Sequence, residues 1–183
     1  RPWRWQSHRT RRNDVLRPHI AAAAASLSPH IRVERASSSR WTKRFSRMAL
    51  VLMCGIPSSG KSAAAADLAA RIRAGEGASP PMEVVVVDEP SLHLHRNASY
   101  VDARAEKNTR GLLKSTVDRA VYRGGPAVIV DCGNHIKGFR YELWCIARQV
   151  GARFCVVHCD APAEDARRWN AARRRGPRGD RDG

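Results

Sequence analysis

The chain has 183 residues, enough for one domain with a buried core, and it is strongly basic. Its 33 lysine and arginine residues exceed its 17 acidic residues and give a formal net charge of +16. Such an excess favours anionic partners such as nucleic acid. No stretch of the sequence has the roughly 18 apolar residues of a membrane helix, so composition excludes a helical membrane-spanning protein.

The positive charge lies mainly at the two ends of the chain. Residues 1–47 carry 12 basic and 2 acidic side chains and residues 171–183 carry 5 and 2, whereas residues 48–170 carry 16 and 13. We therefore predict three parts: a disordered basic leader over residues 1–47, a globular domain over residues 48–172, and a basic disordered tail over residues 173–183.

Three interpretations of the leader stay open. It has Arg-rich and Ser-rich stretches, few acidic residues and no clear helical or strand period. The first is an unstructured or artefactual extension, because the chain opens with Arg1 and Met48 directly precedes the first predicted strand. The second is an organellar transit segment, whose composition the leader shares. The third is a nucleic-acid-binding arm. Because residues 1–47 offer no apolar face to bury, we expect the domain to fold without them.

Short apolar runs alternate with helical patterns between Met48 and Asn170. The runs are bounded by turn or charged residues, as in strands buried on both faces. They cover residues 49–54, 84–87, 127–130 and 154–157, and helical periodicity extends over residues 61–74, 102–122 and 138–150. This alternation predicts an α/β fold in which a parallel sheet is flanked by helices.

The first predicted strand leads into the phosphate-binding pattern GxxxxGK[ST]. Its glycines let the backbone curl so that successive N–H groups converge on phosphate oxygens, and the following helix adds the positive end of its dipole. Lys61 can reach the outer phosphates, and the Ser62 hydroxyl can ligate Mg²⁺. We therefore predict a P-loop NTPase domain that binds ATP with Mg²⁺. The predicted nucleotide-binding residues are Gly55, Ile56, Pro57, Ser58, Ser59, Gly60, Lys61 and Ser62.

A P-loop site also needs a carboxylate from a neighbouring strand. Asp131 directly follows the 127–130 run, at the edge of the sheet where such folds bind ligands, and is the candidate second magnesium ligand; a solvated strand-end aspartate is the alternative. Asp88 ends another strand at the same edge and either accepts the proton of an attacking hydroxyl or water, or caps the next turn. Glu89 is a weaker substitute for Asp88. The candidate catalytic residues are thus Lys61, Asp88 and Asp131.

Arginines on or beyond the helix after the fourth predicted strand offer cations for the charge that develops during phosphoryl transfer. They are Arg167, Arg168, Arg173 and Arg174. One of them belongs to a mobile lid, or all of them form a solvated basic face.

The five cysteines show no CxxC pair, and four of them lie in or beside apolar runs. We expect buried free thiols in a reducing compartment. A zinc site from Cys155, His158 and Cys159 is the alternative, although strand alternation would spread these side chains over both faces of the sheet.

Three sequence blocks resemble those of known families. The P-loop has the form GxPxSGKS, with Pro57 and Ser59, and is similar to that of small nucleic-acid-directed kinases such as polynucleotide kinase and seryl-tRNA kinase. Residues 100–107 (YVDARAEK) with Arg110, and residues 131–143 (DCGNHIKGFRYEL), look like two further blocks. Together the blocks resemble the killer-toxin-insensitivity protein twelve family, the Elongator-associated ATPases.

The resemblance covers about Met48 to Arg173 and implies a P-loop fold of the nucleotide-kinase type. It also implies ATP hydrolysis stimulated by tRNA and association with the Elongator complex in wobble-uridine modification. By the same resemblance, the P-loop residues bind ATP and Asp131 holds magnesium, whereas Asn134, Lys137 and Arg140 belong to the last block without an assigned role. The implied location is cytoplasmic or nuclear, with organellar import as the alternative if the leader is a transit segment.

The sequence departs from the family at both ends. The leader has no counterpart, and the family continues past the Asn170 region into a helical domain linked to tRNA binding. Nucleotide kinases usually have five strands where this chain shows four runs, so we expect a C-terminally truncated domain whose sheet has an uncovered edge. Its tRNA contacts should be partly missing, and the remaining binding, through charge alone, should fall steeply with salt.

Three functions stay open at this stage. The block that contains Asn134 favours an accessory ATPase in tRNA modification. Asp88 acting as a base would favour a kinase for a hydroxyl of RNA or a small molecule. The third function is a non-catalytic scaffold in which bound ATP orders a partner-binding surface.

Overall fold

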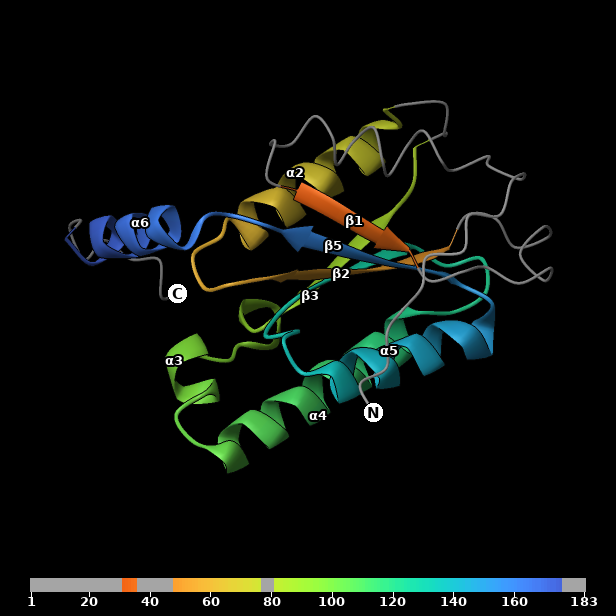
Figure 1. Ribbon diagram of the computed structural model, residues 1–183. Coiled ribbons are helices and arrows are strands. Elements are labelled where there is room, and N and C mark those ends of the chain that lie inside the picture. The colour runs from red at the N-terminus through yellow and green to blue at the C-terminus, as the bar shows by residue number, and fades with distance from the viewer. Residues whose placement is uncertain (1–30, 36–47, 77–80, 176–183) are drawn as a thin grey trace, which may run out of the picture.

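A computed structural model describes residues 31–35, 48–76 and 81–175 of the chain. Four parallel strands and one antiparallel strand form a single sheet with the order β1-β5-β2-β4-β3 (Figure 1). The four predicted apolar runs are the parallel strands, which confirms the α/β prediction. The strands are β1 (Ile31–Arg35), β2 (Ala49–Gly55), β3 (Val84–Asp88), β4 (Ala127–Asp131) and β5 (Arg153–Cys159).

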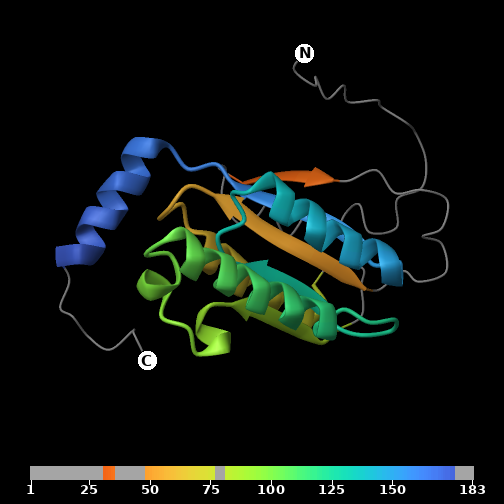
Figure 2. The ribbon, with the colours of Figure 1, turned by 90° about the horizontal axis from the view of Figure 1, so that it is seen from below.

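Helices cover both faces of this sheet. One face carries α2 (Lys61–Ala74), and the other carries α4 (Ala103–Ala120) and α5 (Lys137–Val150), which lie in front of the sheet in Figure 2. The short helices η2 (Pro90–Leu92) and α3 (Arg96–Ser99) follow β3. Helix α6 (Ala163–Arg175) follows β5 and projects beyond the sheet. No helix in the described part of the chain is long and apolar enough to cross a membrane.

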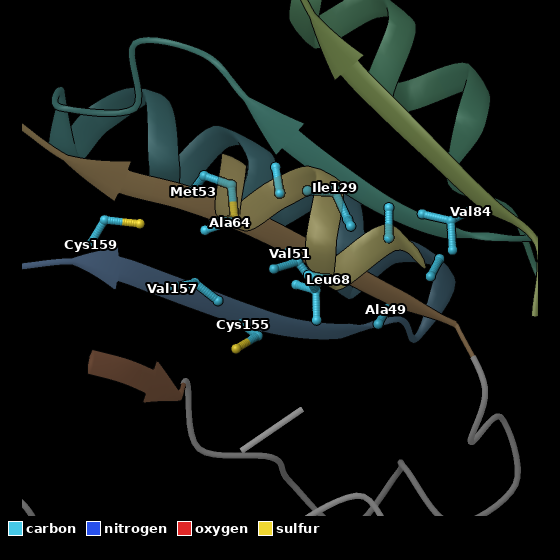
Figure 3. Close-up of a cluster of buried hydrophobic side chains, with 13 residues drawn as sticks. Ala49, Val51, Met53, Ala64, Leu68, Val84, Ile129, Cys155, Val157 and Cys159 are labelled. Atoms are coloured by element: carbon cyan, nitrogen blue, oxygen red, sulfur yellow. The ribbon is translucent and has the colours of Figure 1, made fainter. Parts of the chain in front are cut away.

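The side chains of β2 alternate between two buried clusters. Val51 and Met53 face α2 and pack with Leu68, as Figure 3 shows, whereas Leu50 and Leu52 belong to the cluster under α4 and α5. All of these side chains are fully buried. A strand buried on both faces reads as a continuous apolar run, which is why β2 was visible in the sequence. Burial of each such side chain contributes roughly 1.5–3 kcal/mol.

Four of the five cysteines are buried, as predicted, and no disulfide joins cysteines in the described part of the chain. Cys155 and Cys159 belong to the cluster on the α2 face, but His158, between them in β5, is only partly buried and does not join that cluster. Within the described residues no group of three His, Cys, Asp or Glu side chains could hold a metal ion. The zinc alternative therefore has no support in these residues.

Strand β1 corrects the prediction of an uncovered sheet edge. It pairs antiparallel with β5, with Ile31 opposite Cys159 and Arg35 opposite Cys155. The edge where a fifth strand was expected to be missing is therefore paired, and by part of the predicted leader. The sequence signal was weak because this strand is short and its pairing partner is distant in the chain. Residues 1–30 and 36–47 of the leader lie outside the described residues.

Helix α6 corrects the boundary of the predicted tail. It runs to Arg175, so its last turn includes the first three residues of the segment 173–183. Acidic residues in the first turn of α6, Glu164 and Asp165, suit the positive end of its dipole. Residues 176–183 lie outside the described residues.

Removing residues 1–47 is expected to leave the domain folded but to expose the edge of β5. The described residues of both buried clusters all follow Met48, so the deletion removes none of them. The unpaired backbone groups of β5 would then offer a template for pairing between molecules. Sedimentation velocity should show stronger concentration-dependent association for the shortened chain than for the full chain. Identical sedimentation of the two chains would show that β1 does not protect this edge.

Candidate nucleotide-binding site

The loop between β2 and α2 needs both of its motif glycines. Gly55 has a φ of 141°, and a Cβ there would lie 2.6 Å from the carbonyl oxygen of Cys159. Gly60, the N-cap of α2, has a φ of 85°. L side chains rarely adopt either conformation. The Ser59 hydroxyl inside the loop is buried and has no hydrogen-bond partner among the described residues. Unsatisfied buried groups of this kind call for an explanation such as a ligand.

Lys61 lies across this loop. Its Nζ donates hydrogen bonds to the carbonyl oxygens of Gly55, at 3.1 Å, and of Ile56, at 2.8 Å. Burial, only partly offset by the charge of Asp131, lowers the pKa of the Lys61 ammonium. The predicted phosphate-binding lysine is thus already close to the backbone that would surround the phosphates.

Asp131 and Ser62, the two predicted magnesium ligands, lie side by side. Asp131 is only 3% exposed at the end of β4, so it is not a solvated strand-end residue. Burial raises the pKa of its carboxyl group, and a hydrogen bond from Ser62 together with the charges of Arg96 and Lys61 opposes that rise. A carboxylate beside a hydroxyl is a pair of oxygen donors that fits Mg²⁺, which takes its other ligands from phosphate and water.

Asp88 lies opposite Asp131 in the register of β3 and β4, but its carboxylate has a local partner. The backbone N–H of Ser91 donates to Asp88 Oδ1 at 2.8 Å, and the Ser91 hydroxyl donates to the Asp88 carbonyl at 2.9 Å. The structure therefore favours the turn-capping interpretation. A role as proton acceptor stays a prediction.

The buried carboxylate at the end of β3 is that of Glu89, which the sequence analysis predicted as a weaker candidate than Asp88. It is 1% exposed, and its Oε2 accepts hydrogen bonds from Arg96 Nε at 3.0 Å and Nη2 at 2.8 Å. Its Oε1 accepts a 2.5 Å hydrogen bond from the Tyr100 hydroxyl. That hydroxyl in turn accepts one from the Gly133 N–H at 3.2 Å. Burial and then the bond to Glu89 raise the pKa of Tyr100.

Sequence reasoning missed Arg96 and the contacts of Tyr100. Glu89 and Arg96 do not share a helix or a strand, because η2 lies between them and α3 begins at Arg96, so their ion pair depends on the path of this connection rather than on a regular period. The one available signal was Tyr100, which opens one of the blocks that resemble the family.

Asn134 and Arg140 shape the loop that follows Asp131. The buried Asn134 amide donates to the carbonyl oxygens of Met53, at 2.9 Å, and Val130, at 3.0 Å, and so joins the ends of β2 and β4. Arg140 Nη1 donates to the carbonyls of Asn134 and His135, each at 2.8 Å. Both residues therefore hold the backbone next to the site in place rather than offering groups to a ligand.

The remaining basic candidates whose side chains the structure describes lie at the surface. Helix α6 reaches the loop through a 3.4 Å hydrogen bond from the Ser58 hydroxyl to Asn170 Oδ1. Arg168 pairs with Asp165 at 2.8 Å, and Arg167 is exposed. Lys137 is also exposed, at the start of α5, and the side chains of Arg173 and Arg174 lie outside the described residues.

A family model described as "Chromatin associated protein KTI12" matches residues 48–180. The chain belongs to this family. The match spans the P-loop and both of the other blocks that carried the resemblance.

Similar sequences include KTI12 homologs from plants and animals. The chain is 52% identical over 126 residues to Protein KTI12 homolog of Oryza sativa subsp. indica, covering 69% of this chain and 40% of the relative. It is 43% identical over 116 residues to the Homo sapiens homolog, covering 63% and 31%. The chain thus spans about 40% of the length of the first of these relatives.

Two solved structures share the fold. The crystal structure of Chaetomium thermophilum Kti12 in complex with ADP-AlF3 is 29% identical, with a TM-score of 0.60 over 73% of this chain and 72% of that one. The crystal structure of APE1195 is 19% identical, with a TM-score of 0.55 over 68% and 67%, a likeness of fold alone. The P-loop NTPase fold predicted from the sequence is confirmed.

Replacing Asn134 by Ala should destabilise the fold markedly. The change leaves the carbonyls of Met53 and Val130 buried without their donor, which costs about 1–3 kcal/mol for each. Asn170→Ala is the matched control, because that side chain is exposed and such changes stay within roughly 0.5 kcal/mol. Denaturant unfolding would measure both variants. Equal stability of the two would show that Asn134 does not join the strands.

Proposed function

We propose that this chain binds ATP with Mg²⁺ and hydrolyses it, as the nucleotide-binding part of a tRNA-stimulated ATPase that assists Elongator in wobble-uridine modification. The observation that carries the proposal is the convergence of Lys61, Ser62 and Asp131 at one P-loop. This set supplies a cation for phosphate and oxygen ligands for a metal ion.

Three features support a nucleotide as the ligand. The glycine geometry places the start of α2 at the loop, where free backbone N–H groups attract anions. The buried Ser59 hydroxyl lacks a partner among the described residues. Third, the KTI12-family neighbour of similar fold was crystallised with ADP-AlF3. ATP is the proposed nucleotide by family membership.

The residues at the site fit magnesium. Ser62 and Asp131 would hold the ion, which when bound supplies positive charge to the phosphate oxygens. The described residues provide one carboxylate and one hydroxyl at this point rather than a cluster of three or more acidic, His or Cys side chains. That sparse set suits an ion that keeps water and phosphate ligands.

In the proposed reaction a water oxygen forms a bond to the γ-phosphorus. The bond from that phosphorus to the β–γ bridging oxygen breaks, its electron pair stays with ADP, and the proton of water passes to solvent. Lys61 Nζ would exchange its bonds to the Gly55 and Ile56 carbonyls for phosphate oxygens. The loop backbone N–H groups hold the phosphates in place while the bond breaks.

The tRNA and Elongator parts of the proposal rest on family membership. Because the chain spans about 40% of the length of its plant relative, we assign these partners to the whole protein and nucleotide binding to the part described here. The family description names chromatin, which supports a nuclear pool beside the cytoplasmic one.

ATP labelled at the γ-phosphate, incubated with and without bulk tRNA, tests the proposal. We expect label to appear as inorganic phosphate, faster with tRNA. Lys61→Ala should abolish the release while the melting temperature stays close to that of the parent, since Lys61 is only partly buried. Label on RNA would instead establish a kinase, and binding without turnover would establish a scaffold. Undiminished hydrolysis in the variant would contradict the site assignment.

Asp131→Asn should make nucleotide affinity nearly independent of magnesium. The amide keeps an acceptor for Ser62 but lacks the charge that attracts the ion, and burial already disfavours that charge, so thermal stability should change little. Titrations with and without Mg²⁺ would measure the effect. Asp88→Asn is the control, because the same change at the neighbouring strand end should leave the magnesium dependence intact. If only the control loses that dependence, Asp88 holds the ion.

A further inference from the structure

Arg96 presents a guanidinium that its ion pair with Glu89 holds in place. Its side chain is 51% exposed, whereas that of its partner Glu89 is 1% exposed. Two of the roughly five N–H donors of an arginine are occupied by Glu89 Oε2. No other hydrogen bond to a described residue is seen for this side chain. The Nε and Nη2 side of the Arg96 guanidinium is therefore held by Glu89, and the remaining N–H groups are available to a ligand.

The ion pair with Glu89 holds this guanidinium at the carboxyl edge of the parallel strands, the edge from which the P-loop also leaves β2. Asp88 and Asp131 are opposite each other in adjacent strands, and Glu89 is the next residue along. The Tyr100 hydroxyl, bonded to Glu89, also accepts from the Gly133 N–H, which ties the segment to the loop after β4.

The charges of the neighbouring groups agree with that placement. The guanidinium contributes to lowering the pKa of Lys61, after the larger effect of burial. It also opposes the rise that burial causes in the pKa of Asp131. Arg96 is therefore within electrostatic reach of both the phosphate-binding lysine and the proposed magnesium ligand.

We propose that Arg96 binds the γ-phosphoryl group during transfer and that Glu89, held by Tyr100, is the residue that positions it. The inference rests on the proposed ATP hydrolysis. As the bond to the bridging oxygen breaks and its electron pair moves to ADP, negative charge spreads over the transferring group and the leaving oxygen. The open N–H groups of Arg96 donate to those oxygens, while the water oxygen completes the new bond to phosphorus and releases its proton to solvent.

The arginine that sequence reasoning sought on α6 is thereby replaced by one between β3 and α4. Arg167 is exposed, and Arg168 is engaged by Asp165. A purely structural role for Arg96, neutralising the buried Glu89, predicts a loss of stability alone when the pair is altered. Transition-state binding predicts a loss that depends on the ligand.

The test compares the affinity of the full chain for ADP and for ADP with aluminium fluoride, both with Mg²⁺. Aluminium fluoride should tighten ADP binding to the parent. Arg96→Lys keeps the charge opposite Glu89 and the fold but loses the planar fork. We expect at least tenfold loss of the tightening, with ADP affinity changed less than about threefold. Arg167→Ala is the matched control and should keep the tightening.

Glu89→Gln tests the positioning role separately. It keeps an acceptor for Tyr100 but weakens the hold on Arg96, so kcat for ATP should fall while KM stays nearly constant. A changed melting temperature with unchanged kcat and unchanged tightening would establish a structural pair only and overturn the proposal. Full tightening in Arg96→Lys would overturn it too.

The same titrations separate this inference from the proposed function. If the parent binds ADP but aluminium fluoride does not increase its affinity for ADP, the proposed hydrolysis fails and the role of Arg96 fails with it. If aluminium fluoride strengthens ADP binding equally in the parent and in Arg96→Lys, the proposed hydrolysis stands and only the role of Arg96 is wrong. Loss of tightening in Arg167→Ala alone would assign the cation to α6.

Discussion

The site depends on how Asn134 joins two strand ends. The pairing of β2 with β4 ends at Leu52 and Val130, and beyond it the two strands lead to the P-loop and to Asp131. The Asn134 amide donates to one carbonyl from each strand, Met53 and Val130, where the ladder stops. Because a buried carbonyl without a donor is costly, this amide holds the two strands at a fixed separation. The phosphate-binding loop and the proposed metal ligand therefore keep a constant relation to each other.

A balance of charge follows from that arrangement. Lys61 and Asp131 carry opposite charges within electrostatic reach of each other, and Arg96 and Glu89 form an ion pair at the end of β3. The two cations and two anions leave the site close to neutral. A triphosphate with its magnesium ion brings negative charge at the phosphates and positive charge at the metal, so each partner of these pairs has a counterpart in the ligand. The site is in this sense organised before the nucleotide arrives.

The parts of the fold and site that depend on local sequence patterns could be predicted, whereas those that depend on contacts between distant residues could not. The buried strands appear as apolar runs, and the P-loop motif and the strand-end position of Asp131 follow from chain order alone. Strand β1 has two apolar residues in five, and its partner β5 lies more than a hundred residues away. The interaction of Glu89 with Arg96 depends on the path of η2 and α3, which no periodicity describes. Position at the strand end favoured Asp88 over Glu89 as the candidate catalytic carboxylate. In the structure, however, the Asp88 carboxylate accepts a hydrogen bond from the Ser91 backbone N–H.

The cost of the Glu89–Arg96 pair is itself an argument for a role beyond stability. Burying a carboxylate carries a desolvation penalty that its ion pair barely repays, and apolar replacements of such pairs are often as stable or more so. Here the carboxylate is 1% exposed and three hydrogen bonds from Arg96 and Tyr100 hold it. An exposed arginine on α6 such as Arg167 would lose up to about 2 kcal/mol of side-chain entropy on meeting a phosphate. Arg96 has already lost much of that freedom in the folded chain, so more of its interaction with the ligand remains available for stabilising the transferring phosphoryl group.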